Sequence, residues 1–149
     1  MTEPLSEPLS DEQAMAQVVD AARQIVRGAG LREVTGGFLF ESCNDQGAPP
    51  YRGRVDMSFA VPAGAEPEQH FSQIAAAMVR QGWTAGPPAG KRPFGVVVHT
   101  EAVMAIIGRA CGDAARGSAQ VRGECRNVTD HHHDAKTVGV EISEQLSGS

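Results

Sequence analysis

The chain has 149 residues, the size of one ordinary domain, and its 41% hydrophobic and 21% charged residues are typical of a globular protein. A net charge of −5, with basic residues as scattered as Arg52, Arg54, Lys91 and Arg92, argues against a nucleic-acid partner, because phosphate binding needs a clustered basic surface. No apolar run approaches the roughly 20 residues that cross a bilayer. The composition therefore predicts one folded domain.

A long helix is predicted near the start of the chain. Residues 1–9 repeat Glu-Pro-Leu-Ser and carry two prolines, so they are expected to form a flexible tether. Ser10 lies three residues before Gln13, which is the spacing of a capping box and predicts the start of a helix. Apolar residues then recur at helical spacing as far as Ala29, and Gly30 offers a C-terminal cap.

Two strands are predicted after this helix. Residues 34–43 include three consecutive apolar residues, which is typical of a buried strand. From Arg54 to Val61 polar and apolar residues alternate, and this is the clearest strand pattern in the chain. The stretch between the two strands is rich in turn residues and predicts a hinge of the sheet.

The second half of the chain predicts one more helix and three strands. Pro67 suits the first position of a helix, whose apolar stripe ends before Gly82. Residues 94–100 and 103–109 read as a hairpin, and residues 119–125 alternate as a last strand. This order predicts an α+β fold, a two-layer sandwich with two helices packed on one face of a mainly antiparallel sheet of about five strands.

The same pattern predicts how the chain is divided. A single α+β domain is expected over residues 10–146. The tether at residues 1–9 precedes it, and residues 147–149 form a short C-terminal tail.

Three cysteines allow one disulfide. Cys43 and Cys125 each end a predicted strand, whereas Cys111 lies among small and polar residues, so the first two are the favoured pair. Such a bond closes a long loop and would contribute roughly 4 kcal/mol in the chain-entropy account. The alternative is that all three are reduced thiols of a cytosolic protein. No histidine adjoins Cys111, which favours a plain thiol over a reactive one.

The histidine run at residues 130–134 is the strongest local motif. Alternate side chains of an extended segment point to the same side, so His131 and His133 could share a zinc or copper ion, with a further ligand from Asp134 or from elsewhere in the fold. The alternatives are adventitious metal binding by a solvated histidine-rich tail, or a response to acid.

The remaining histidines do not indicate catalysis. His70 and His99 each lie within a predicted element and are more typical of structural histidines than of ligands. The sequence has no nucleophile elbow, no HExxH motif and no phosphate-binding glycine loop. No enzymatic activity and no cofactor are therefore predicted.

Several motifs occur together in one order. They are Asp11–Val19, Ser42–Gly47 with Pro49–Tyr51, His70-Phe71, Gly82-Trp83 with Gly86–Pro88, and Gly123–Asn127 with Thr129–Asp134. In these motifs, from about Leu9 to Leu146, the chain resembles the mycobacterial LppJ type of lipoprotein.

This resemblance implies an exported protein, lipid-anchored at the extracytoplasmic face of the cell membrane, with no established activity. It also favours the disulfide between Cys43 and Cys125. The signal peptide and the lipid-bearing cysteine of such proteins are not in this sequence, so residues 1–9 are expected to follow the anchor. The resemblance supplies no functional residues, and Cys111 does not belong to its pattern.

Three functions are compatible with these features. The leading one is a non-catalytic binding or interaction module for an envelope protein or a small ligand, with no nucleic-acid partner. The second is a metal-binding protein that uses His131 and His133. The third is a thiol enzyme acting through Cys111, which is the least favoured because no base adjoins that residue.

Overall fold

The computed structural model describes residues 7–44, 46–88, 95–110, 112–131, 134, 136–137 and 139–147. The elements of these residues, in chain order, are α1 (Asp11–Ala29), β1 (Thr35–Ser42), β2 (Tyr51–Ala60), α2 (Pro67–Arg80), β3 (Thr84–Ala85), β4 (Val96–His99), β5 (Met104–Ala110), β6 (Asp113–Arg122), β7 (Val140–Glu141) and α3 (Ser143–Ser147).

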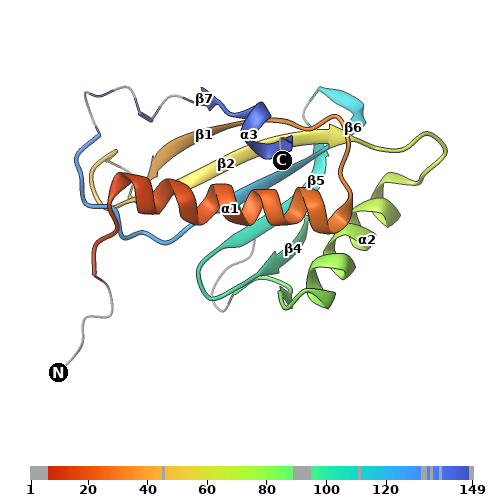
Figure 1. Ribbon diagram of the computed structural model, residues 1–149, viewed down its shortest axis with the longest axis horizontal. Helices are drawn as coiled ribbons and strands as arrows, with labels where there is room; N and C mark the ends of the chain where they lie inside the picture. Colours follow the sequence, from red (N-terminus) through yellow and green to blue (C-terminus); the bar gives the residue numbers. More distant parts are fainter. Residues whose placement is uncertain are drawn as a thin grey trace.

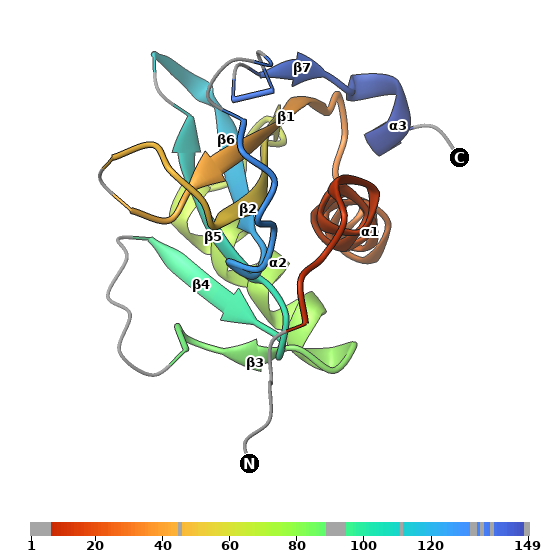
Figure 2. The same ribbon diagram turned by 90° about the vertical axis from the view of Figure 1, so that its left-hand side faces the viewer.

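The strands form one sheet in the order β3-β4-β5-β6-β2-β1-β7, and every described pairing is antiparallel. Helix α1 runs across the front of this sheet (Figure 1). Seen from the side, α1 is viewed end-on next to the sheet, so this helix and the sheet form two layers (Figure 2).

Local signals set the ends of α1 and its distance from the sheet. The Ser10 hydroxyl accepts a hydrogen bond from the Gln13 backbone N–H at 3.0 Å, and the Gln13 side chain accepts one from the Ser10 N–H at 2.9 Å. The helix ends at Gly30, whose φ of 65° is left-handed. Gly53 of β2 lets the helix approach closely, because a Cβ there would lie 2.5 Å from the carbonyl oxygen of Ala14.

Alternation along β2 separates the two faces of the sheet. Tyr51, Val55 and Phe59 are buried toward α1. The ring of Phe71 in α2 lies 6.4 Å from that of Phe59, so α2 covers the same face. In the described part of the chain no helix packs on the opposite face, which carries Arg52, Arg54 and their neighbours on β1 and β6 and is called here the open face.

The predicted class is confirmed, and two of its details are wrong. The described sheet has seven strands rather than about five, and there are three helices rather than two. Strands β3 and β7 have two residues each, which is too short to produce a visible alternation. Helix α3 has five residues and is held by the buried side chains of Ile142 and Leu146.

Strand β6 also begins earlier than its sequence pattern indicated. It starts at Asp113 instead of Ala119, because pairing with β2 and β5 holds the small residues that precede the alternating stretch. A sequence such as Ala115 to Gly117 has weak strand propensity of its own. Tertiary pairing therefore decides this boundary.

A disulfide joins Cys43 to Cys125, as the sequence interpretation expected. Cys43 follows β1 and Cys125 follows β6, with their Cα atoms 6.2 Å apart and a sequence separation of 82 residues. Since β2 lies between these two strands, the bond ties segments on either side of the central strand. Cys111 lies outside the described residues.

The residues just before α1 contact the segment next to the Cys43–Cys125 disulfide. The Leu9 N–H donates to the Arg126 carbonyl at 2.8 Å, and the Arg126 guanidinium donates to the Glu7 carbonyl at 2.8 Å. Residues 1–6 lie outside the described residues, so the flexible tether stays a prediction.

Candidate functional site

The open face gathers arginines because the register of the sheet aligns them. One row of Cα partners crosses five strands through His99, Met104, Arg122, Arg54 and Leu39. Two arginines are therefore direct neighbours on β6 and β2. Like charges placed directly opposite each other on paired strands destabilise a sheet.

Two carboxylates hold the arginines of β2 in fixed positions. Glu41 accepts hydrogen bonds from Arg52 Nε at 2.7 Å and from Arg54 Nη1 at 2.6 Å. Asp56 accepts a bidentate pair from Arg54, at 3.0 Å to Nε and 2.9 Å to Nη2. Fork-shaped pairs of this kind fix a guanidinium in direction as well as in position.

The pKa values of these groups reflect the ion pairs. Burial raises the pKa of Glu41, but the hydrogen bonds and charges of Arg52 and Arg54 outweigh it, so the pKa lies below its ordinary value. Burial lowers the pKa of Arg54, but Asp56 and Glu41 outweigh that effect and raise it. Each of these groups is thus held in its charged form.

Arg122 is in the opposite situation. Its Nε donates to the side-chain oxygen of Gln120, and no ion pair to Arg122 is found among the described residues. Burial lowers the pKa of Arg122, and the positive charges of Arg52 and Arg54 lower it further against the partial opposition of Glu41 and Asp56. Glu41 and Asp56 thus compensate the charge of Arg122 only in part, and no described carboxylate forms a direct ion pair with it.

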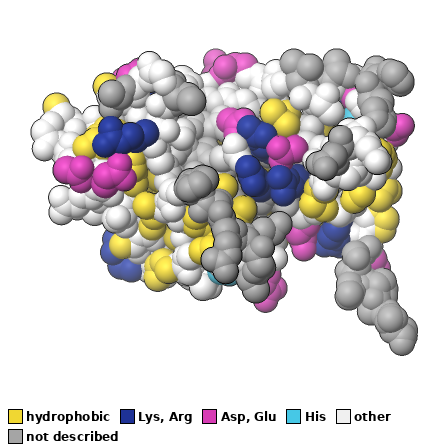
Figure 3. All heavy atoms as spheres, turned by 180° about the vertical axis from the view of Figure 1, so that it is seen from behind, with side chains coloured by type: hydrophobic (Ala, Val, Ile, Leu, Met, Phe, Trp, Pro, Cys, Tyr) yellow, Lys and Arg dark blue, Asp and Glu magenta, His cyan; other side chains and the backbone are white. Residues whose placement is uncertain are grey.

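Arg52, Arg54 and Arg122, called here the arginine cluster, carry more positive charge than the two carboxylates beside them balance. Figure 3, which shows the molecule from behind α1, has dark blue and magenta side chains side by side near the middle of this face. A positive excess here contrasts with the net charge of −5 of the whole chain. The arginine cluster thus differs in charge from the chain as a whole.

A cavity of about 420 Å³ adjoins the cluster. Its lining includes Leu39, Glu41, Ser42, Gly47 and Arg54. Ligand pockets in proteins measure about 300 to 1,000 Å³. Guanidinium groups keep their proton at neutral pH, so this arrangement suits the binding of an anion rather than proton transfer.

The sequence interpretation missed this cluster. It treated Arg52 and Arg54 as scattered, although their spacing of two within an alternating strand already placed both on one face. No sequence signal placed Arg122 opposite Arg54, because that neighbour is set by the order of strands in the sheet.

The predicted metal ligand His131 lies in the core. Its side chain is 0% exposed, and its ring stacks on Phe40 with centroids 4.1 Å apart and meets Tyr51 edge-on at 4.8 Å. Its Nδ1 lies 2.6 Å from an oxygen of Asp134, and its Nε2 lies 2.8 Å from the side-chain oxygen of Asn127. The expectation of a solvated tail is therefore wrong at His131, which is a structural residue.

Hydrogen bonds around Asn127 connect His131 to the start of α1. The Asn127 amide nitrogen donates to Asp11 at 2.9 Å and to the Leu9 carbonyl at 3.1 Å. This fixes the amide oxygen toward the histidine, so the ring meets an oxygen acceptor at each nitrogen. Lys136 adds an ion pair to Asp11 at 3.2 Å.

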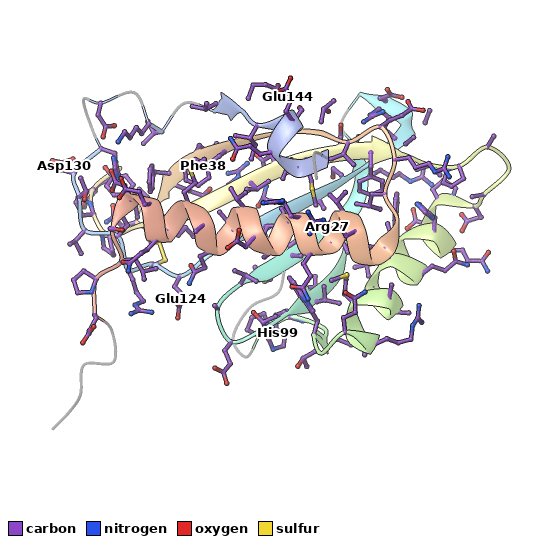
Figure 4. The ribbon with its side chains drawn as sticks, in the orientation of Figure 1. Arg27, Phe38, His99, Glu124, Asp130 and Glu144 are labelled. Carbon is purple, nitrogen blue, oxygen red and sulfur yellow. A yellow bond between two sulfur atoms is a disulfide. The ribbon has the colours of Figure 1, made fainter. Side chains whose placement is uncertain are left out.

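This geometry gives no support to a metal site at His131, because both ring nitrogens already take part in hydrogen bonds. His133 lies outside the described residues, so that half of the prediction stays untested. His99 hydrogen-bonds the Gly86 carbonyl at 2.8 Å and lies well away from Asp130 (Figure 4). His70 contacts Phe59, at the far end of β2 from His131. The described residues contain no group of three or more metal-ligating side chains.

Two carboxylates of the histidine network have lowered pKa values. Burial raises the pKa of Asp11, but hydrogen bonds from Asn127 and Lys136 and the charge of His131 outweigh it. The small desolvation of Asp134 also raises its pKa, and hydrogen bonds from His131 and the Lys136 backbone outweigh it. Both groups favour the charged form more strongly in the folded protein than in the unfolded chain.

These shifts predict loss of stability in acid. A carboxylate with a lowered folded-state pKa stabilises the fold above its unfolded pKa, and this contribution disappears as the pH falls through the folded pKa. The free energy of unfolding from urea titrations is expected to fall between about pH 5 and about pH 2. Asp134→Asn is expected to make this fall shallower, whereas Asp20→Asn, on the exposed side of α1, serves as the control. An unchanged pH dependence in Asp134→Asn would contradict the assignment.

Comparison with known proteins identifies the family. Residues 10–145 match the family described as "Putative lipoprotein LppJ". The chain belongs to the LppJ lipoprotein family. Proteins of that description from Mycobacterium tuberculosis strains CDC 1551 and H37Rv and from Mycobacterium bovis are each 47% identical over 133 residues, which are 89% of this chain and 70% of the relative. No solved structure matches the chain.

Membership of the LppJ family implies a membrane-associated protein of the cell envelope. Among the helices described, none has the length and apolar content that a membrane crossing needs. The disulfide agrees with this placement, because such bonds persist in oxidising compartments.

Proposed function

We propose that the chain is a non-catalytic binding domain, held on the extracytoplasmic face of the cell membrane by an N-terminal lipid anchor. Its partner is an envelope protein or a small ligand, which it binds through the open face of the sheet. The description of the LppJ family supports the anchored location and names no reaction.

One observation carries this proposal. Arg122 lies on the open face, directly opposite Arg54, and no described carboxylate pairs with it. Local rules of charge pairing are broken mainly where a protein has a function to perform. The arginine cluster is therefore the part of the described surface that is best suited to a partner. The metal-binding alternative has no comparable observation in its favour.

Photo-crosslinking of the full-length, lipid-anchored protein in a mycobacterial host tests the surface. A photoreactive residue at Ser118, on the open face of β6 four residues from Arg122, is expected to give adducts. The same residue at Gln24, on the exposed side of α1, is the control and is expected to give none. Intact mass measurement detects protein and small-molecule adducts alike. Adducts from Gln24 alone would assign binding to the helical face and overturn the proposal.

A further inference from the structure

We propose that the arginine cluster binds a phosphate-type oxyanion carried by a small ligand. This inference rests on the proposed function and adds the chemical class of the ligand. The cluster consists of Arg52, Arg54 and Arg122, with Glu41 and Asp56 as its two carboxylates.

The first argument is the charge at the centre of the cluster. Arg122 and Arg54 are Cα partners on adjacent strands, so their repulsion is built into the sheet. Glu41 and Asp56 are both engaged by Arg52 and Arg54. A bound dianion beside Arg122 would supply the missing countercharge without any change of backbone.

The second argument is the supply of free donors. The described hydrogen bonds occupy Nε and all terminal nitrogens of Arg54, but only Nε of Arg122. Among the described residues, both terminal nitrogens of Arg122 therefore remain as a fork, and guanidinium forks match the spacing of phosphate oxygens. Glu41 and Asp56 fix the neighbouring arginines Arg52 and Arg54 in position.

The third argument concerns the size of the ligand. The side chains of Arg52 and Arg54 are only 16% and 25% exposed. A lipid surface is met by protruding basic side chains, several of which reach the headgroups together. The cavity of about 420 Å³ that Arg54 and Glu41 share instead has room for the body of a small ligand.

Titration of the 149-residue protein with inorganic phosphate, followed by NMR of backbone amides and arginine Nε–H groups, tests this inference. Signals of Arg122 and its neighbours on β2 and β6 are expected to shift. Arg122→Gln is expected to weaken phosphate binding by about tenfold or more, and Arg122→Lys, which keeps the charge but not the fork, by less. Arg27→Gln, at an exposed position of α1, which packs on the opposite face of the sheet, is the matched control and should bind like the wild type.

Thermal unfolding separates a binding role from a structural one. Without phosphate, Arg122→Gln is expected to have a melting temperature equal to or above that of the wild type, because the repulsion with Arg54 is gone. Phosphate should raise the melting temperature of the wild type and not that of the variant. A variant that melts lower and still binds phosphate would show that Arg122 is structural, and would overturn the inference.

Binding to lipid vesicles tests whether the oxyanion is instead a lipid headgroup. Cosedimentation with vesicles containing phosphatidylglycerol, compared with phosphatidylcholine alone, is expected to show no binding that depends on Arg122. Arg122-dependent vesicle binding without phosphate binding would overturn the small-ligand assignment. Adducts at Ser118 in cells without any phosphate binding would overturn the oxyanion assignment and leave the open-face proposal intact.

Discussion

Replacing Cys43 and Cys125 together with serine is expected to lower the free energy of unfolding by about 4 kcal/mol. The bond closes a separation of 82 residues, so its loss restores much of the freedom of the unfolded chain. It also ties the segments after β1 and β6, on either side of the central strand β2. Urea unfolding without reductant, compared with the wild type, measures the loss.

Two controls accompany this measurement. Cys111→Ser leaves the Cys43 to Cys125 bond intact and should unfold like the wild type. Wild-type protein in reductant should unfold like the double variant. Three cysteines open to alkylation in the native protein, or equal stability of the double variant and the wild type, would contradict the disulfide.

His131→Ala is expected to destabilise the fold by about 3 kcal/mol. The side chain is fully buried, and its removal leaves a cavity between Phe40 and Tyr51. It also leaves the oxygen of Asn127 buried without the hydrogen bond from Nε2. Chemical unfolding measures the difference from the wild type.

A second variant separates packing from hydrogen bonding at this position. His131→Phe keeps an aromatic ring against Phe40 but removes both nitrogens, so it should recover only part of the loss. His99→Ala serves as the matched control, since His99 is half-buried and makes one described hydrogen bond, to Gly86. Its expected cost is about 1 kcal/mol. A loss of less than this in His131→Ala would show that the histidine is not a core residue.

The disulfide variant and the His131 variant remove two different stabilising features of the domain. The disulfide stabilises the whole domain, and the His131 network joins the start of α1 to the segment that follows β6. Neither includes a residue of the arginine cluster, although Phe40 and Tyr51, which pack on His131, also line the cavity beside it. Folded but weakened versions of either variant should therefore retain phosphate binding, provided that the sheet is intact.

The helix α1 and the strand β2 show what sequence patterns can establish. The capping box at Ser10 and Gln13 and the glycine at position 30 fix the ends of α1 through contacts within a few residues. The alternation in β2 determines which side chains share a face, since successive side chains of a strand point in opposite directions. Each pattern lies within a single helix or strand, so it can be recognised without knowing which other elements pack against it.

The histidine run shows that the residue types of a short segment do not determine whether its side chains are exposed. Three consecutive histidines suggested either a solvated tail or a shared metal ion, yet His131 belongs to the core and contacts Phe40 and Tyr51. Its partners come from β1, β2 and the segment around Asn127, which only the fold brings together. Burial, rather than residue type, decides whether a histidine is a ligand or a structural residue.

The sequence by itself determined the α+β class, both long helices, the alternation of β2, the favoured cysteine pair and the family resemblance. Only the tertiary structure decided the short strands β3 and β7, the early start of β6, the burial of His131 and the position of Arg122 opposite Arg54. The physical reason is the sequence separation over which the determining interactions act. Caps and periodicity act over a few residues, whereas strand order and register depend on pairings between segments far apart in the chain, and those pairings place the charges of the open face.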